Sequence, residues 1–376
     1  MAKTAIPWAT HTWNPIAGCT KVSPACDNCY ALAMSWRIQN NPKHPARYDG
    51  VCEKVDSEVC WTGRINVDGS AIDEARLWRK RRIVFVCSMS DLFHPGVADE
   101  VIEDIFYHMT TFIRHTFLVL TKRPERMARL VPDLWEGLAF DDLYTPAPNI
   151  WLGVTAENQE MADERIPTLL RIPAAGHFVS LEPMLSSIDL TPYLPCPTCG
   201  GGGEMGPGSG DAAWYPGRPC RDCDGDEPAL DFVIAGGETG PGARPAHPDW
   251  FRQARDQCAE AGVPFMFKQH GEWLHHSQVA STSPASRRVF IDQGDGNWAW
   301  VPAFMQMEPH AWTKGAVEDI GDITDMSYRV GKKDAGHPLD GPGEIKGHPE
   351  HIDAVDQQDD PGTEDLPQQT SALVSG

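Results

Sequence analysis

The chain has 376 residues, enough for one large domain or two smaller ones, and its 41% hydrophobic content supports a packed core. A net charge of −21 argues against a broadly basic surface for gripping a nucleic acid duplex. No stretch has the length and apolar character of a membrane span or a secretory signal, so we expect a cytoplasmic protein that does not bind a membrane. Eleven cysteines in that compartment indicate metal or redox chemistry rather than disulfides.

The first feature along the chain is a short loop that contains Cys19, Cys26 and Cys29. Three thiolates can bind three corners of a [4Fe–4S] cluster and leave the fourth iron open to a small molecule. Gly18 suits the tight path that such a loop needs. Two alternatives stay open, buried free thiols and a zinc ion with a distant fourth ligand. The nearest candidates for that fourth ligand are His11, His44 and Cys52.

Short apolar runs then recur roughly 30 residues apart, which is the length of a strand–helix unit. Because both faces of each run are apolar, we interpret them as buried parallel strands. They lie at 83–87, 116–120, 150–154, 177–181, 231–235 and 264–267. Helical patterns occupy 101–113, 158–170, where Pro167 interrupts, and 248–261, which Gly262 ends. This order predicts an α/β fold, a partial or complete (β/α) TIM-like barrel over residues 1–273, with a doubly wound open sheet as the alternative.

Polar residues follow nearly every predicted strand, and in a barrel these positions meet at one mouth. We therefore expect a shared polar cavity. Lys122 and Arg123 are suited to bind a carboxylate or phosphate, and Glu157, Glu182 and Glu238 to hold hydroxyls or amines. The candidate catalytic residues are Asp91, Lys122 and Glu182.

A second cysteine group interrupts the regular spacing of the strands. Cys196 with Cys199, and Cys220 with Cys223, form two CxxC pairs about 20 residues apart, the pattern of a zinc ribbon. We expect a structural Zn²⁺ in a small insertion at 195–228. Beyond the barrel, the sequence predicts a partly packed C-terminal extension at 274–330 and a disordered acidic tail at 331–376.

The segment from Asn14 to Ala31, with its three cysteines, resembles the cluster loop of radical SAM enzymes, closest to the branch of spore photoproduct lyase. The stretch from about Ile6 to Trp273 resembles more closely a phage- and prokaryote-borne three-cysteine-motif family of unestablished function. The matching segments are Thr12–Pro15, Ser88–His94, Leu120–Arg126, Ala162–Pro167, Gly236–Glu238, Pro241–Pro245 and Phe267–Gln269.

This resemblance implies that Cys19, Cys26 and Cys29 hold a [4Fe–4S] cluster to which S-adenosylmethionine binds. It places the loop at a barrel mouth after a short first strand at 12–14. Six residues separate the first two cysteines, where three are usual, and Asn28 replaces the usual aromatic residue. The expected cofactor contacts are Ser88, Ser90, Asp91, Glu157 and Glu238.

Three functions follow from these features. The first is a radical SAM-like enzyme that modifies a nucleic acid or nucleobase, supplied by an electron donor such as flavodoxin or ferredoxin, in the host cytoplasm if a phage encodes it. The second is base exchange of the tRNA-guanine transglycosylase type, inserting a 7-deazaguanine into phage DNA with Asp91 as nucleophile. The third is a non-catalytic, zinc-stapled partner protein.

Overall fold

A computed structural model describes residues 2–4, 6–139, 145–196, 229–275, 288–292, 298–302 and 325–329. Its centre is an eight-stranded sheet in the order β1-β2-β7-β8-β9-β10-β11-β12. β1 pairs antiparallel with β2, and the other seven strands run parallel. The bounds are β1 Ala2–Lys3, β2 His11–Trp13, β7 Ile83–Val86, β8 Thr116–Thr121, β9 Ile150–Thr155, β10 Gly176–Leu181, β11 Phe232–Gly236 and β12 Phe265–Gln269.

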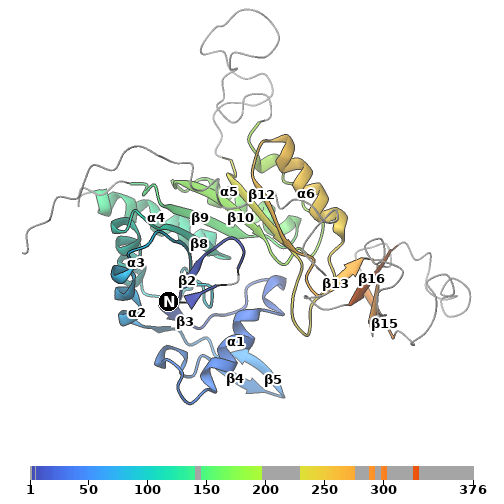
Figure 1. Ribbon diagram of the computed structural model, residues 1–376, viewed down its shortest axis with the longest axis horizontal. Coiled ribbons are helices and arrows are strands. Elements are labelled where there is room, and N and C mark those ends of the chain that lie inside the picture. The colour runs from blue at the N-terminus through green and yellow to red at the C-terminus, as the bar shows by residue number, and fades with distance from the viewer. Residues whose placement is uncertain are drawn as a thin grey trace, which may run out of the picture.

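The parallel strands follow one another in chain order without a reversal. Because crossovers between parallel strands are right-handed, such an order places every crossover helix on the same face of the sheet. Figure 1 shows this arrangement, with α3, α4, α5 and α6 along the outside of the curved sheet. The fold is therefore a curled half-barrel, compatible with part of a TIM-like barrel, and the doubly wound alternative is wrong because its strand order would reverse. The helices are α3 Asp99–Thr111, α4 Pro124–Ala139, α5 Gln159–Leu170 and α6 Pro248–Glu260.

Both faces of the sheet are buried, as the continuous apolar runs predict. In β7, Val84 and Val86 pack outward in a cluster with the helices, whereas Ile83 and Phe85 belong to a second cluster on the inner face. Trp8 belongs to that inner cluster, and its ring centroid lies 4.4 Å from that of Phe85. The N-terminal segment thus packs against the inner face of the half-barrel.

The helices agree with the sequence pattern at the end of α6 and differ from it within α5. Gly262, which adopts a φ of +72°, follows the end of α6 as expected. Pro167 does not interrupt α5, which continues to Leu170. The prediction of a break there was wrong because the buried side of α5, with Ile166 and Leu169, packs against the core on either side of the proline.

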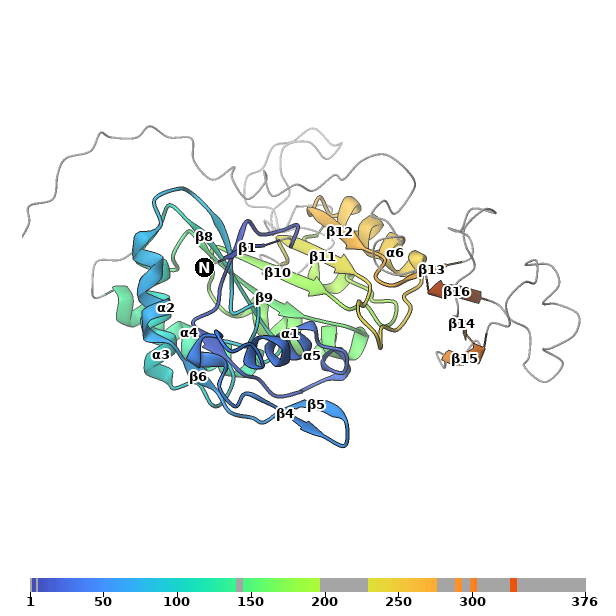
Figure 2. The ribbon, with the colours of Figure 1, turned by 60° about the horizontal axis from the view of Figure 1, so that its bottom comes forward.

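The loop and helix that follow β2 form a separate group with the segment before β7. It contains α1 Tyr30–Gln39, the short sheet of β3 Ile16–Ala17 and β6 Asn66–Val67, the hairpin of β4 Cys52–Val55 and β5 Glu58–Trp61, and α2 Gly69–Asp73. Figure 2 shows α1 and the β4–β5 hairpin together below the large sheet. This group brings the cysteine loop to the carboxyl ends of the parallel strands.

The expected C-terminal extension contains a four-stranded antiparallel sheet in the order β13-β16-β14-β15. The strands are β13 Trp273–His275, β14 Arg288–Asp292, β15 Trp298–Pro302 and β16 Asp325–Arg329. Most of the predicted zinc insertion and the whole of the predicted tail lie outside the described residues. Within the described part of the chain, no helix has both the length and the apolar character that crossing a bilayer requires.

Candidate functional site

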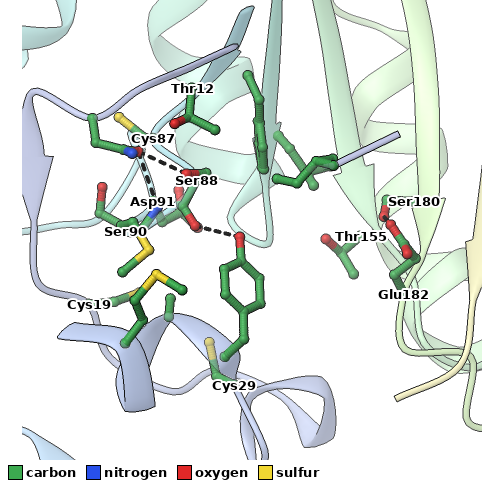
Figure 3. A pocket seen from close by; sticks show the side chains of 18 of the residues that line it. Thr12, Cys19, Cys29, Cys87, Ser88, Ser90, Asp91, Thr155, Ser180 and Glu182 are labelled. Atoms are coloured by element: carbon green, nitrogen blue, oxygen red, sulfur yellow. Dashed lines mark hydrogen bonds between the residues drawn. The ribbon is translucent and has the colours of Figure 1, made fainter. Parts of the chain in front are cut away.

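A cavity of about 950 Å³ opens at the carboxyl ends of the parallel strands. The cysteine loop forms one side, and residues that end or follow the parallel strands β7 to β12 form the other. Figure 3 shows Cys19 and Cys29 across an open space from Thr155, Ser180 and Glu182. The predicted polar residues that line it are Ser88, Ser90, Asp91, Lys122, Arg123, Glu182 and Glu238. The prediction of a shared polar cavity is thus confirmed, with Glu157 outside its lining.

The three cysteines of the N-terminal loop all line this cavity, and all are free and half-buried. Among the described residues, no three His, Cys, Asp or Glu side chains converge closely enough to hold a metal ion. A [4Fe–4S] cluster is larger than one ion and spaces its thiolates at separate corners, so this finding bears on a single zinc ion rather than on a cluster. The donor set, three thiols beside an open cavity, fits an iron–sulfur cluster in kind.

The first of three acid–arginine pairs holds the loop at Cys19. Arg123 Nη1 lies 2.7 Å from Asp91 Oδ2 and 3.9 Å from Cys19 Sγ. The other terminal nitrogen of Arg123 donates to the carbonyl and the hydroxyl of Thr20, at 3.0 Å each. Arg123 therefore links the end of β8 to the first cysteine of the loop.

Asp91 also accepts hydrogen bonds from the hydroxyl of Thr121 at 2.7 Å and from the backbone N–H groups of Phe93 and Lys122 at 3.0 and 3.2 Å. With Arg123, four donors surround this buried carboxylate. Such an engaged carboxylate is a weak nucleophile, so its geometry favours positioning of Arg123 over the catalytic role predicted from the sequence.

The second pair lies beneath the middle of the loop. Glu157 and Arg165 are 0% and 3% exposed, and Glu157 Oε2 lies 3.1 Å from Arg165 Nη1. The other carboxylate oxygen of Glu157 accepts the backbone N–H of Ala25 at 3.2 Å. Because Glu157 lies outside the cavity lining, the expectation of a direct cofactor contact is replaced by support of the loop next to Cys26.

The third pair holds the end of the loop. Glu238 Oε1 lies 2.6 Å from Arg244 Nη2, and Glu238 Oε2 accepts the side-chain amide of Asn28 at 3.0 Å. The same nitrogen of Arg244 donates to the carbonyl of Pro24 at 2.8 Å. Glu238, a predicted cofactor contact, therefore fixes the residue before Cys29 while it also faces the cavity.

The two predicted serines connect the loop to the end of β7. Ser88 donates to Asn14 Oδ1 at 3.1 Å, and its carbonyl accepts the hydroxyl of Tyr30 at 2.6 Å. Ser90 donates to the carbonyl of Ile16 at 3.0 Å. Both still line the cavity.

The surroundings of Cys19 do not activate its thiol. Burial and the nearby Asp91 carboxylate raise the pKa of Cys19 to about 11, although Arg123 opposes this shift. The thiol is therefore protonated at neutral pH, and binding a metal centre would displace that proton.

The other two predicted catalytic residues lie on the far wall. Lys122 Nζ is 3.4 Å from Thr155 Oγ1, and Glu182 Oε1 is 2.8 Å from Lys268 Nζ. Glu182 also accepts the hydroxyl of Ser180 at 3.3 Å. Lys122 and Glu182 therefore lie where a substrate in the cavity would meet them.

Of the predicted zinc ligands, Cys196 is described and half-buried, whereas Cys199, Cys220 and Cys223 lie outside the described residues. The structure adds site residues that the sequence reasoning missed, namely Asn28, Arg165 and Arg244. Arg165 follows Glu157 by eight residues, a spacing of about two helical turns that gives a weak signal. The link from Arg244 to Pro24 had no local signal, because 220 positions separate them.

The fold and the site together define a half-barrel protein with a three-cysteine loop over the carboxyl ends of its parallel strands. Residues 3–346 match the model of a family described as "Protein of unknown function (DUF5131)". The chain belongs to this family. No curated protein and no solved structure gave a significant match.

Gly18, the residue before Cys19, allows a test of the backbone geometry at the start of the cysteine loop. Gly18 has a φ of +97°, and a Cβ there would lie 2.0 Å from the carbonyl oxygen of Arg64. We expect Gly18→Ala to destabilise the protein by about 1–3 kcal/mol, measured by chemical denaturation, because it adds backbone strain to the clash. Gly69→Ala is the matched control, since its Cβ would meet nothing within 4 Å. Equal stability of the two variants would contradict this account of the loop.

Proposed function

We propose that the protein is a radical SAM-type enzyme that holds a [4Fe–4S] cluster on Cys19, Cys26 and Cys29. The observation that supports this proposal most is the loop itself, whose three free thiols line one cavity. Three acid–arginine pairs hold it at separate points. Fixed supports of this kind position metal ligands, and their loss typically weakens metal binding.

A [4Fe–4S] cluster held by Cys19, Cys26 and Cys29 would supply the electron for reductive cleavage of S-adenosylmethionine. The chain's own residues prepare the site for that chemistry. Arg123 places a positive charge beside Cys19 and stabilises its thiolate form. Asp91 and Thr20 fix the direction of that guanidinium. We propose an electron donor of the flavodoxin or ferredoxin class, a structural Zn²⁺ in the insertion, and a cytoplasmic location.

Anaerobic reconstitution with iron and sulfide tests this function. We expect a brown protein that absorbs near about 400 nm, as iron–sulfur clusters do. We also expect the reduced protein to form 5′-deoxyadenosine from S-adenosylmethionine. A colourless protein that keeps only zinc after this treatment would contradict the proposal.

Base exchange of the transglycosylase type receives less support. That reaction needs a carboxylate free to attack a glycosidic carbon. Asp91 instead accepts hydrogen bonds from four donors, among them the guanidinium of Arg123. This reading also leaves the three loop cysteines without a role. A non-catalytic partner protein, in turn, has no need of the polar cavity.

A further inference from the structure

The wall of the cavity opposite the cysteine loop carries a row of polar side chains, which we call the polar band. Its members come from the ends of β8, β9, β10 and β12, and all line the cavity. Figure 3 shows three of them, Thr155, Ser180 and Glu182, facing the space in front of Cys19 and Cys29. The polar band consists of Lys122, Thr155, Ser180, Glu182, Lys268 and Gln269.

Two members of the band have bonding capacity that the protein does not use. Gln269 is 4% exposed, and its side-chain oxygen is buried without a hydrogen-bond partner in the described part of the chain. Lys122 Nζ contacts the hydroxyl of Thr155 at 3.4 Å, and no carboxylate among the described residues lies within ion-pair distance of it. A buried acceptor without a donor costs free energy, so a ligand that donates a hydrogen bond to Gln269 would be stabilised. A ligand that carries an anionic group would in the same way pair with the ammonium group of Lys122.

The centre of the band offers an acceptor and a donor side by side. Glu182 and Lys268 form an ion pair at 2.8 Å, and Ser180 donates to the other oxygen of Glu182. A carboxylate has about four acceptor positions, so Glu182 retains capacity for further N–H groups. Glu182, Lys268 and Gln269 together present two acceptors and one cationic donor.

This pattern complements the Watson–Crick edge of guanine, which carries two N–H donor groups and the O6 acceptor. Adenine has a single amino donor there and matches less well. A planar base also needs a face to stack on, and Tyr30, which lines the cavity, is 48% exposed with its hydroxyl fixed by the carbonyl of Ser88.

The span of the band fits a ligand of nucleotide size. Lys122 follows β8 and Gln269 ends β12, and these strands are four positions apart in the sheet. At about 4.8 Å per strand this is roughly 19 Å on a flat sheet, and less on a curved one. A single amino acid zwitterion is too short to serve both ends.

We propose that the polar band binds a free guanine nucleotide, with the base edge at Glu182, Lys268 and Gln269 and the phosphate at Lys122. The net charge of −21 favours a free nucleotide over a nucleic acid strand. This inference deepens the proposed function and rests on it for the reaction, though not for the binding.

Calorimetric titration of the full chain with the four nucleoside monophosphates tests the inference. We expect GMP to bind at least about tenfold more tightly than AMP, CMP or UMP, because a mismatched edge leaves polar groups unpaired. Lys122→Met should lower the affinity for GMP about tenfold and leave the affinity for guanosine unchanged, since guanosine has no phosphate. Glu182→Gln and Gln269→Leu should each lower the affinity for GMP and for guanosine by the same factor. Lys54→Met, on the exposed β4–β5 hairpin, is the matched lysine control and should bind as wild type.

Equal affinity for all four nucleotides, or an equal effect of Lys54→Met and Lys122→Met, would overturn the inference. So would complete displacement of GMP by S-adenosylmethionine, which would assign the band to that cofactor. Tighter binding of a single-stranded oligonucleotide ending in guanosine would overturn the choice of a free nucleotide. GMP binding by a chain that takes up no iron would support this inference and contradict the proposed function. Iron uptake without GMP binding would support the proposed function and contradict this inference.

Discussion

Replacing Cys19, Cys26 and Cys29 together by alanine is expected to reduce reconstituted iron from about four atoms per chain to background, because no thiolate then remains to hold the cluster. The absorption near about 400 nm should disappear with the iron. Iron and zinc are measured by elemental analysis of the reconstituted protein. Zinc should remain at about one per chain, since the predicted ligands Cys196, Cys199, Cys220 and Cys223 are untouched.

Cys60→Ala is the matched control for this experiment. Cys60 is also free and half-buried, but it lies on β5 and does not line the cavity. We expect it to load iron like the wild type. Full iron loading of the triple variant, or equal loss in Cys60→Ala, would show that the N-terminal loop is not the cluster site.

Glu157→Leu is expected to destabilise the protein by about 3–5 kcal/mol, because it leaves the buried guanidinium of Arg165 without its anion. The double variant Glu157→Leu/Arg165→Met should recover most of that loss, since apolar side chains replace both charges. Chemical denaturation of the single and double variants measures this difference. A double variant as unstable as the single one would show that the charge imbalance is not the cause.

The same double variant distinguishes two roles of the Glu157–Arg165 pair, stabilising the fold and supporting the cysteine loop. Glu157 also accepts the N–H of Ala25, next to Cys26, and neither apolar replacement can do so. We therefore expect a folded double variant with reduced iron uptake, because the loop has lost one of its supports. Wild-type iron uptake by that variant would limit the role of the Glu157–Arg165 pair to the core.

The strands of the half-barrel were predictable because each is apolar on both faces. Residues 83–87, 116–120 and 150–154 stand out against the polar segments around them, and the structure places β7, β8 and β9 within a residue of these bounds. The prediction that Pro167 interrupts α5 was wrong, because tertiary packing of the helix outweighs the backbone hydrogen bond lost at the proline.

The site was predictable in its parts. Cysteine spacing drew attention to the loop, and the polar residues after each strand pointed to a common cavity, where most of them lie. The sequence did not separate residues that face the cavity from those that support the loop. Glu157 and Glu238 both follow strands, but Glu157 is buried under Ala25 whereas Glu238 lines the cavity.

Composition and local pattern by themselves determined the strand–helix alternation, the cysteine loop and the row of polar strand ends, because burial and spacing act over a few residues. Only the tertiary structure decided that the sheet is a half-barrel wound in one direction and that arginines distant in the chain hold the loop. Those features depend on contacts such as Arg123 with Thr20 and Arg244 with Pro24, over 103 and 220 positions, and no local pattern records such distances.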